Sequence, residues 1–374
     1  MTAPAILIPD ELKPRDGRFG SGPTKVRPEA LQSLARVGDE LLGTSHRKPT
    51  VRREVARLQE GLSELFSLPD GYEVLIAVGG ATAFWDMAAF GLVRQRSLHY
   101  VFGEFSGKFA GSTAAAPWLD EPVTVDSQPG TRPDLVATPD GVDVQALTHN
   151  ETSTGVAMDL RRPEGDALVL VDATSGAGGL PVDVSQTDVY YFSLQKGFAS
   201  EGGLVCALLS PTAVDRIEEL AASDRYIPPF LSLRTALENS RKNQTYNTPS
   251  VSAVFLAAEQ THWMLQQGGL AWAVSSCAAK GQAIYGWAEK SQYAEPFVTD
   301  PAARSNVVAT IDLDDTVDAD TLDEVLRANG ILDTDAYRKL GRNQLRVGLF
   351  PAVDLADVEA YTACVDHVVD RLTR

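Results

Sequence analysis

Between Pro28 and about residue 250, short apolar runs alternate with stretches of helical periodicity, and this alternation constrains the fold most. Several runs are apolar at nearly every position rather than every second one, as in strands buried on both faces. Strands that alternate with helices form a mainly parallel sheet with helices on both sides. The pattern predicts strands at 73–78, 98–102, 144–148, 168–172, 189–193 and 204–208, and helices after Ala81, Ser106 and Pro211.

The same pattern predicts three parts. The segment 1–28 is rich in Gly, Pro and charge, which is typical of an extended arm that leads into a helix. Residues 29–255 contain the strand and helix alternation and form the large domain. In residues 256–374, helices alternate with two expected strands at 306–311 and 344–347, which indicates a smaller α+β domain.

Composition excludes several classes of partner. The formal net charge of −17 argues against sequence-independent nucleic-acid binding, although a few local arginines can still bind an anionic small molecule. We find no apolar stretch long enough to span a bilayer and no signal-peptide pattern. Cys206, Cys277 and Cys364 are widely spaced and lack the spacing of metal ligands, so we expect buried thiols and no metal. The sequence predicts a soluble, cytoplasmic protein without nucleic-acid or membrane partners.

Two of the expected strands end in charged side chains. Leu168–Asp172 ends in Asp172, and Tyr190–Lys196 carries Lys196 just beyond its strand. Both should face one crevice, because ligands bind at the carboxyl ends of parallel strands. Asp172 can pair with a protonated pyridine nitrogen, and a desolvated Lys196 can form a Schiff base, which is the chemistry of pyridoxal phosphate. The alternative is an ion pair that caps two neighbouring strands.

Three further elements suit such a cofactor. Gly79-Gly80-Ala81-Thr82 follows a strand and opens a helix, so the amides at Ala81 and Thr82 and the Thr82 hydroxyl can bind phosphate. Phe105 lies just beyond a strand and can stack on an aromatic ring. Thr152 can donate a hydrogen bond to the ring's polar groups. Each has a plainer alternative: a tight turn, core packing and a turn cap.

Substrate binding would need cations, and two clusters supply them. Ser45-His46-Arg47 is one, and the segment that ends at Arg346 is the other. Arginine binds carboxylate or phosphate through two parallel hydrogen bonds. Arg346 stands within an apolar strand pattern, which argues against a purely solvated role, whereas we expect Arg338 and Arg342 to be exposed.

Taken together, these residues resemble the phosphoserine aminotransferases, a class V family of fold-type I pyridoxal-phosphate enzymes. The resemblance covers nearly the whole chain, and its length and pattern are most similar to the actinobacterial form. The segments that carry it are Phe19–Pro23, Ser45–Arg47, Asn150–Thr152, Asp172, Gln195-Lys196 and Asn247–Pro249. Each segment is weak alone, but their order and spacing are specific.

The resemblance implies a role for each matching position. Lys196 would form the Schiff base and Asp172 would pair with the pyridinium. The ring's polar edge and the phosphate would be held by Gln195, Thr152, Ala81 and Thr82. Asn247 and Thr248 would reach the phosphate of the neighbouring subunit's cofactor, which implies a homodimer. The substrate's anionic groups would be bound by His46, Arg47 and Arg346.

This sequence departs from the family pattern in two places. Phe105 occupies the position where the family often stacks a Trp on the pyridine, a change that cofactor binding should tolerate. The His-Arg pair common before the last strand is absent, and Arg338, Lys339 and Arg342 lie nearby instead. The second departure leaves the phosphate clamp open among these three cations.

The activity implied is a ping-pong transfer of an amino group from glutamate to 3-phosphohydroxypyruvate in serine biosynthesis. The products would be 2-oxoglutarate and phosphoserine, and related enzymes often also act on the four-carbon analogue in pyridoxine biosynthesis. An alanine–glyoxylate aminotransferase is an alternative, but it has less need of the Ser45–Arg47 cluster.

Other classes are less well supported. A cysteine desulfurase needs a nucleophilic Cys on a mobile loop, whereas Cys206 lies in a strand pattern. A nicotinamide oxidoreductase would carry a full Gly-x-Gly-x-x-Gly motif, which Gly79-Gly80 does not supply. A non-catalytic protein on the same fold is an alternative that a substituted lysine would favour, but Lys196 is present.

Overall fold

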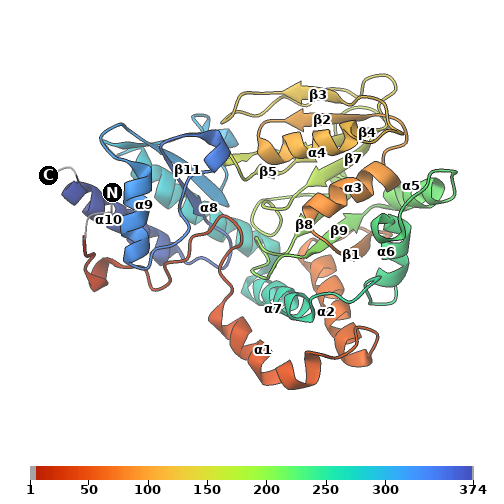
Figure 1. The fold of residues 1–374 in the computed structure, drawn as a ribbon, viewed down its shortest axis with the longest axis horizontal. Helices are drawn as coiled ribbons and strands as arrows, with labels where there is room; N and C mark the ends of the chain where they lie inside the picture. The colour runs from red at the N-terminus through yellow and green to blue at the C-terminus, as the bar shows by residue number, and fades with distance from the viewer. Residues whose placement is uncertain (1–5, 373–374) are drawn as a thin grey trace.

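A seven-stranded sheet lies at the centre of the larger part of the computed structural model, which describes residues 6–372 (Figure 1). Six strands run in the same direction, and β9, between β1 and β8, runs against them. The predicted mainly parallel sheet is thereby confirmed. Across the sheet the strands are β1 (Glu73–Val78), β9 (Leu204–Leu209), β8 (Val189–Ser193), β7 (Leu168–Asp172), β4 (Val144–Thr148), β2 (Ser97–Val101) and β3 (Val123–Asp126).

Alternate residues of these strands pack into two separate cores, one on each face of the sheet. One core is covered by α2 (Pro49–Leu65) and α7 (Val251–Gln267). The other is covered by α3 (Ala81–Gly91), α4 (Glu104–Ala114), α5 (Pro211–Ala221) and α6 (Leu233–Ser240). The strands are therefore buried on both faces, as their continuous apolar runs predict.

The smaller part is built on a three-stranded antiparallel sheet with its own core (Figure 1). Ile8 and Phe19 of the N-terminal segment belong to that core. The strands and helices are β10 (Ala294–Pro296), β11 (Val308–Leu313), β12 (Gln344–Gly348), α8 (Gly269–Ala288), α9 (Ala319–Ala328) and α10 (Leu355–Leu372). The boundary predicted at residue 255 falls inside α7, and we propose that the division lies at Gly268-Gly269, between α7 and α8.

The remaining elements are short, apart from one helix. The N-terminal segment leads into α1 (Pro28–Leu41), and a small hairpin is formed by β5 (Asn150–Glu151) and β6 (Val156–Ala157). Single turns of 3-10 helix lie at Asp10–Leu12, Val184–Gln186, Pro229–Leu231, Pro301–Ala303 and Arg338–Leu340. Within residues 6–372, the structure contains no helix long and apolar enough to cross a membrane.

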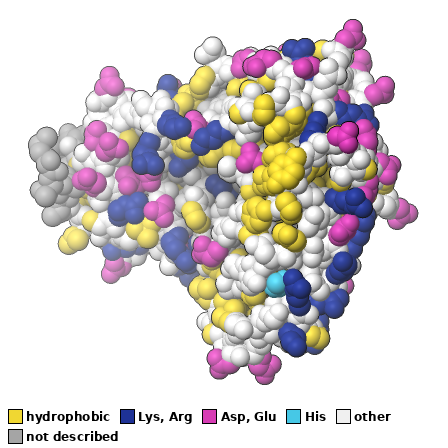
Figure 2. Space-filling view, turned by 45° about the vertical axis from the view of Figure 1, so that its right-hand side comes forward, with side chains coloured by type: hydrophobic (Ala, Val, Ile, Leu, Met, Phe, Trp, Pro, Cys, Tyr) yellow, Lys and Arg dark blue, Asp and Glu magenta, His cyan; other side chains and the backbone are white. Residues whose placement is uncertain are grey.

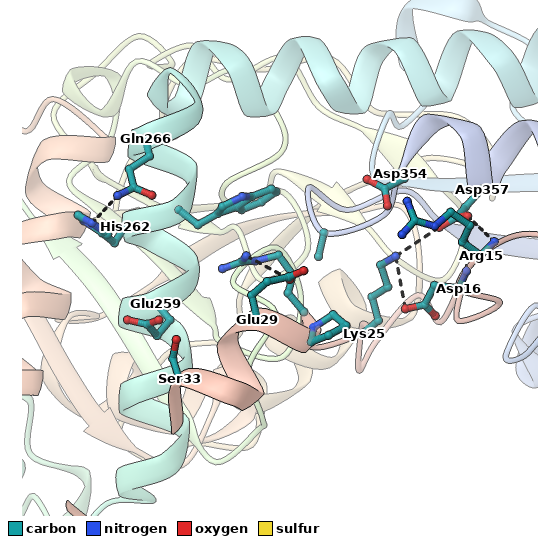
Figure 3. A pocket seen from close by; sticks show the side chains of 14 residues that line it. Arg15, Asp16, Lys25, Glu29, Ser33, Glu259, His262, Gln266, Asp354 and Asp357 are labelled. Atoms are coloured by element: carbon teal, nitrogen blue, oxygen red, sulfur yellow. Dashed lines mark hydrogen bonds and ion pairs between the residues drawn. The ribbon is translucent and has the colours of Figure 1, made fainter. Parts of the chain in front are cut away.

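The N-terminal segment joins the two parts through buried charges. Figure 3 shows the Lys25 side chain pointing between Asp16 and Asp357. Its Nζ lies 3.6 Å from Asp16 Oδ2 and 3.5 Å from Asp357 Oδ2. Asp357 lies in α10, so this cluster ties the segment to the smaller part. Arg27 lies over the ring of Trp263 on α7, 4.3 Å from its centre, and ties the same segment to the larger part. Residues 15–27 therefore bridge the two parts.

The observed bounds differ from the predicted ones in a few places. The helix expected after Ser106 begins at Glu104, because the buried Glu151 carboxylate accepts the amides of Phe105 and Ser106. The strand expected at 306–311 spans Val308–Leu313, because the Ser305 hydroxyl accepts the amides of Val307 and Val308 and so delays the start of the strand. The periodicity of the sequence cannot predict such contacts, because they join distant residues or depend on a single side chain.

Candidate active site

A cavity of about 640 Å³ lies at the carboxyl ends of the central strands. Its walls come from the ends of β4, β7 and β8, from the start of α3 and from the N-terminal segment at Gly22-Pro23. This is the position where an open parallel sheet binds ligands. Among the predicted cofactor residues, the cavity is lined by Ala81, Thr82, Phe105, Thr152, Asp172, Gln195 and Lys196.

Asp172 is the last residue of β7, and its carboxylate is held by two donors from different elements. Oδ2 accepts the indole N–H of Trp85 on α3 at 3.0 Å, and Oδ1 accepts the backbone N–H of Thr174 at 3.0 Å. Burial raises the pKa of Asp172, and these hydrogen bonds oppose that shift. Asp172 is thus a carboxylate fixed in orientation beside the cavity.

Lys196 follows β8 in the loop that closes the cavity. Its Nζ donates a hydrogen bond to the carbonyl oxygen of Ser21 at 2.6 Å. Burial and the positive charge of Arg346 together lower the pKa of Lys196 to about 7, although Asp172 and Glu151 oppose the shift. Near neutral pH a large fraction of this amine is unprotonated, so it can act as a nucleophile.

Gly22 is required by the position of Lys196. A Cβ atom on Gly22 would lie 1.9 Å from Lys196 Nζ, and the backbone at Gly22 has φ of +138°. Both the close approach and the backbone conformation favour glycine. The Gly in the Phe19–Pro23 segment therefore leaves room for the lysine that the sequence places 174 residues later.

The start of α3 forms the second end of the cavity. Gly79 and Gly80 have φ of +137° and +147°, so the chain turns sharply from β1 into the helix. The Ala81 amide donates to the Ser193 hydroxyl at 2.7 Å, and Thr82 lines the cavity beside it. The amides and the dipole at a helix N-terminus attract phosphate, so this end suits an anionic group.

Several polar atoms around the cavity have no partner within the described chain. They are buried and belong to residues that line it: Thr174 Oγ1, Asn150 Oδ1 and Gln195 Oε1. Buried polar atoms are nearly always hydrogen-bonded, so such a group of orphans indicates a polar ligand. With an amine, a carboxylate, an aromatic ring and a helix N-terminus on one cavity, the residues fit pyridoxal phosphate.

Glu151 organises the wall that carries Phe105. Its carboxylate is buried and accepts the amides of Phe105 and Ser106 at 3.1 and 2.9 Å and the Ser153 hydroxyl at 2.8 Å. Burial raises the pKa of Glu151, and these donors oppose that shift. The next residue, Thr152, donates to Ser175 at 2.8 Å. This carboxylate therefore fixes the start of α4 and the ring of Phe105.

The remaining site predictions divide into two groups; they are His46, Arg47 and Arg346 for the substrate, and Asn247 and Thr248 for the neighbouring subunit's cofactor. Arg346 on β12 is mostly buried, lies over the ring of Tyr337 at 5.3 Å, and acts electrostatically on Lys196. His46 and Thr248 contact one another at 3.2 Å, away from the cavity. Arg47 is exposed, and neither it nor Asn247 lines the cavity of the described chain. Within one chain, Arg346 thus lies near Lys196, whereas His46, Arg47, Asn247 and Thr248 lie away from the cavity.

The three candidates for the phosphate clamp differ in their partners. Arg342 pairs with Asp312, with Nε 3.0 Å from Oδ1, and Lys339 pairs with Glu104 at the start of α4. Arg338 is exposed and forms no ion pair with residues 6–372. Of the three, Arg338 is the cation whose charge is still available to a ligand.

Sequence reasoning missed three residues that surround the cofactor positions. Trp85 and Thr174 bind Asp172, and Ser193 binds the Ala81 amide. A signal existed for Trp85, since it lies four residues after Ala81 and therefore one helical turn along the same face. No local pattern indicates the Glu151 contacts, because they join residues 45 and 46 positions apart.

Comparison with known proteins gives consistent matches. The model of the class-V aminotransferase family matches residues 128–334. A putative phosphoserine aminotransferase of Mycobacterium leprae is 58% identical over 371 residues, covering 99% of this chain and 98% of that protein. A phosphoserine aminotransferase of Nocardioides is 57% identical, covering 98% and 99%. The crystal structure of phosphoserine aminotransferase from Cytophaga hutchinsonii matches with a TM-score of 0.88 at 26% identity, covering 94% and 99%.

Proposed function

The chain belongs to the phosphoserine aminotransferases of the class-V family, and we propose that it moves the amino group of glutamate to 3-phosphohydroxypyruvate at the cavity around Lys196. It is a pyridoxal-phosphate-dependent aminotransferase. One observation carries the assignment of the site: Asp172 and an amine with a pKa of about 7 face the same cavity, with a helix N-terminus at its other end. These are the groups that the cofactor's ring nitrogen, aldehyde and phosphate require.

The residues would hold the cofactor as follows. Lys196 would bind it covalently, Asp172 would face its ring nitrogen, and Phe105 would cover one face of its ring. The first turn of α3, with Ala81 and Thr82, would bind its phosphate. When bound, pyridoxal phosphate supplies an electron sink for the electron pair left as the substrate's α C–H bond breaks.

Lys196 is also the proton carrier that this site offers. In its unprotonated form Nζ accepts the proton from the substrate's α-carbon and can return it to a neighbouring atom. The Ser21 carbonyl, 2.6 Å away, holds the amine in position within the cavity. A charged Asp172 carboxylate would favour a protonated ring nitrogen beside it, and its two donors favour that charged form against the effect of burial.

Arg346 would bind a substrate carboxylate. Its guanidinium is mostly buried, and its Nε has no hydrogen-bond partner in the described chain. A buried arginine without a partner is costly, and a planar carboxylate satisfies it with two parallel hydrogen bonds. Arg346 therefore supports binding of glutamate and of the oxo acid by their carboxylates.

We also propose a homodimer in which His46, Arg47, Asn247 and Thr248 complete the site of the partner subunit. These residues lie outside the cavity of their own chain, yet His46 and Thr248 are in contact. Figure 2 shows a band of hydrophobic side chains down the middle of one face, which suits an interface. Large hydrophobic residues exposed in the chain include Leu31, Val37, Leu42, Tyr226, Phe230 and Tyr246.

Two finer assignments accompany this proposal. The phosphorylated four-carbon analogue used in pyridoxine biosynthesis has the same carboxylate and phosphate, so we propose that the site accepts it too. We propose a cytoplasmic location, which suits the three buried free thiols of Cys206, Cys277 and Cys364.

Replacing the lysine tests the function directly. Lys196→Ala should abolish turnover and covalent cofactor attachment, because the variant has no amine in the cavity. Lys290→Ala, which removes an exposed lysine of the smaller part, is the matched control and should behave as wild type. Steady-state transamination and borohydride trapping of the cofactor measure both properties. Normal turnover by Lys196→Ala would contradict the assignment.

A further inference from the structure

We propose that Trp85 is a positioning residue of this reaction, whose indole N–H orients the Asp172 carboxylate and so keeps the cofactor's ring nitrogen protonated. The inference rests on the proposed function, since it takes Asp172 as the partner of that nitrogen. It concerns a residue that does not belong to the motifs on which the cofactor site was predicted.

The geometry around Trp85 is rigid. The side chain is 3% exposed, lines the cavity, and places Nε1 3.0 Å from Asp172 Oδ2. Its ring stacks on Phe109 of α4, with 6.2 Å between the centres and 17° between the planes. Thr174 holds the other carboxylate oxygen. With one donor from α3 and one from the loop after β7, the plane of the carboxylate is fixed from both sides.

The chemistry of the indole group decides what this contact does. An indole N–H donates and cannot accept, so it stabilises the charged form of Asp172 and cannot bind a proton placed on that oxygen. The titratable and charged groups around Asp172 are Tyr191 on β8, Lys196 beyond β8 and, acting on Lys196, Glu151 and Arg346. Trp85 is the donor that α3 contributes to this set.

Helix α3 would then hold both ends of the cofactor. Its first turn carries Ala81 and Thr82 at the proposed phosphate site, and Trp85 follows one turn later on the same face. The helix packs through Phe84 on Tyr191 of β8, with 4.2 Å between the ring centres. A single rigid element therefore links the phosphate site to the carboxylate that faces the ring nitrogen.

The test removes the N–H while keeping the shape. Position 85 is replaced by β-(3-benzothienyl)alanine, in which sulfur takes the place of the indole N–H, and separately by Phe in Trp85→Phe. Trp287→Phe, on α8 outside the cavity, is the matched control, because its indole N–H also donates to a carboxylate, that of Asp366. Each protein is loaded with pyridoxal phosphate labelled with ¹⁵N in the ring, and the nitrogen's NMR shift is followed against pH. Equilibrium dialysis measures the cofactor's Kd.

Loss of the donor raises the pKa of Asp172, so its carboxyl competes better for the proton that it shares with the ring nitrogen. The ¹⁵N shift of both Trp85 variants should therefore move toward that of the unprotonated ring. Their cofactor Kd should rise about tenfold, while the control stays as wild type. If the benzothienyl variant has the same ¹⁵N shift against pH and the same cofactor Kd as the wild type, the proposal is overturned. Trp85 would then have a packing role only. Failure of the wild type to bind the cofactor would instead refute the proposed function, so the two failures are distinguishable.

Discussion

At the scale of single residues, burial is what makes Lys196 reactive. Removed from water beside Arg346, the amine has a pKa of about 7 rather than the 10.5 of an exposed lysine. The carboxylates of Asp172 and Glu151 limit that shift. The sequence places a lysine beyond a buried strand, but the charges that shift its pKa come from three other segments, those of Arg346, Asp172 and Glu151.

The pKa of Lys196 gives a prediction for cofactor uptake by the apoprotein. Because the folded-state pKa is lowered, the amine is protonated and unreactive below pH 7 and becomes nucleophilic as pH rises through that value. Well below pH 7 the association rate should rise about tenfold per pH unit and then level off. Stopped-flow absorbance with added pyridoxal phosphate measures it.

Arg346→Gln provides the matched comparison for that experiment. Removing the positive charge should raise the pKa of Lys196 and move the inflection to higher pH. Ionisation of the cofactor's own phosphate is the same for both proteins and cannot cause such a difference. An inflection that does not move would show that the profile does not report Lys196.

The sequence could predict the role of a residue where a chemically reactive side chain stands at the end of a strand. Asp172 and Lys196 follow apolar strands, and the rule that parallel strands bind ligands at their carboxyl ends placed them together. Trp85 and Glu151 could not be assigned in the same way. A Trp in an apolar helix has the pattern of core packing, and a Glu after a strand has the pattern of a surface turn. Only their partners in space give them roles.

At the scale of elements, the start of α4 depends on a buried charge from another segment. Glu151 of β5 accepts amides from the first turn of α4, where the helix dipole favours an anion. This contact sets both the beginning of the helix and the position of Phe105. Helical periodicity alone therefore placed the start of α4 after Ser106, later than the observed start at Glu104.

Glu151→Gln tests that dependence. Both oxygens of the Glu151 carboxylate accept backbone N–H groups, so at least one hydrogen bond is lost whichever oxygen the NH₂ group of Gln replaces. We expect the free energy of unfolding to fall by about 2 kcal/mol, the typical value for a buried hydrogen bond to a charged group. Urea unfolding of the apoprotein measures it.

The exposed Glu121→Gln is the control for the Glu151 experiment and should leave stability within about 0.5 kcal/mol. A Glu151→Gln protein as stable as wild type would mean that the amides of α4 are satisfied in another way. Glu151 would then not be the residue that sets the start of α4 at Glu104.

At the scale of the whole molecule, the sheet was predictable and the closure of the site was not. Continuous apolar runs identified six strands of the large sheet, whereas β3 has alternating burial and was missed. The antiparallel direction of β9 cannot be predicted from a hydropathy pattern, because the pattern is the same for either strand direction. Contacts such as Ser21 with Lys196 join the N-terminal segment to the sheet across 175 positions, a separation that local patterns do not register.

The proposed dimer makes a prediction about mixed subunits. Lys196→Ala and Arg47→Ala should each be inactive as homodimers. In a hybrid dimer, one site would combine an intact Lys196 with an intact Arg47 from its partner, so about half the wild-type activity per dimer should return. Co-expression with two different affinity tags isolates the hybrid. If Arg47 acts within its own chain, both hybrid sites carry one defect and no activity returns.

The most direct test of the central claim is the visible absorption spectrum of the purified, cofactor-loaded enzyme during the two half-reactions. Added glutamate should convert the band of the lysine-bound cofactor to that of pyridoxamine phosphate, and 3-phosphohydroxypyruvate should restore it. Unphosphorylated hydroxypyruvate should restore it at least about 100-fold more slowly, because it lacks the group that the site's cations bind. A band that ignores glutamate, or that returns equally fast with both oxo acids, would contradict the account.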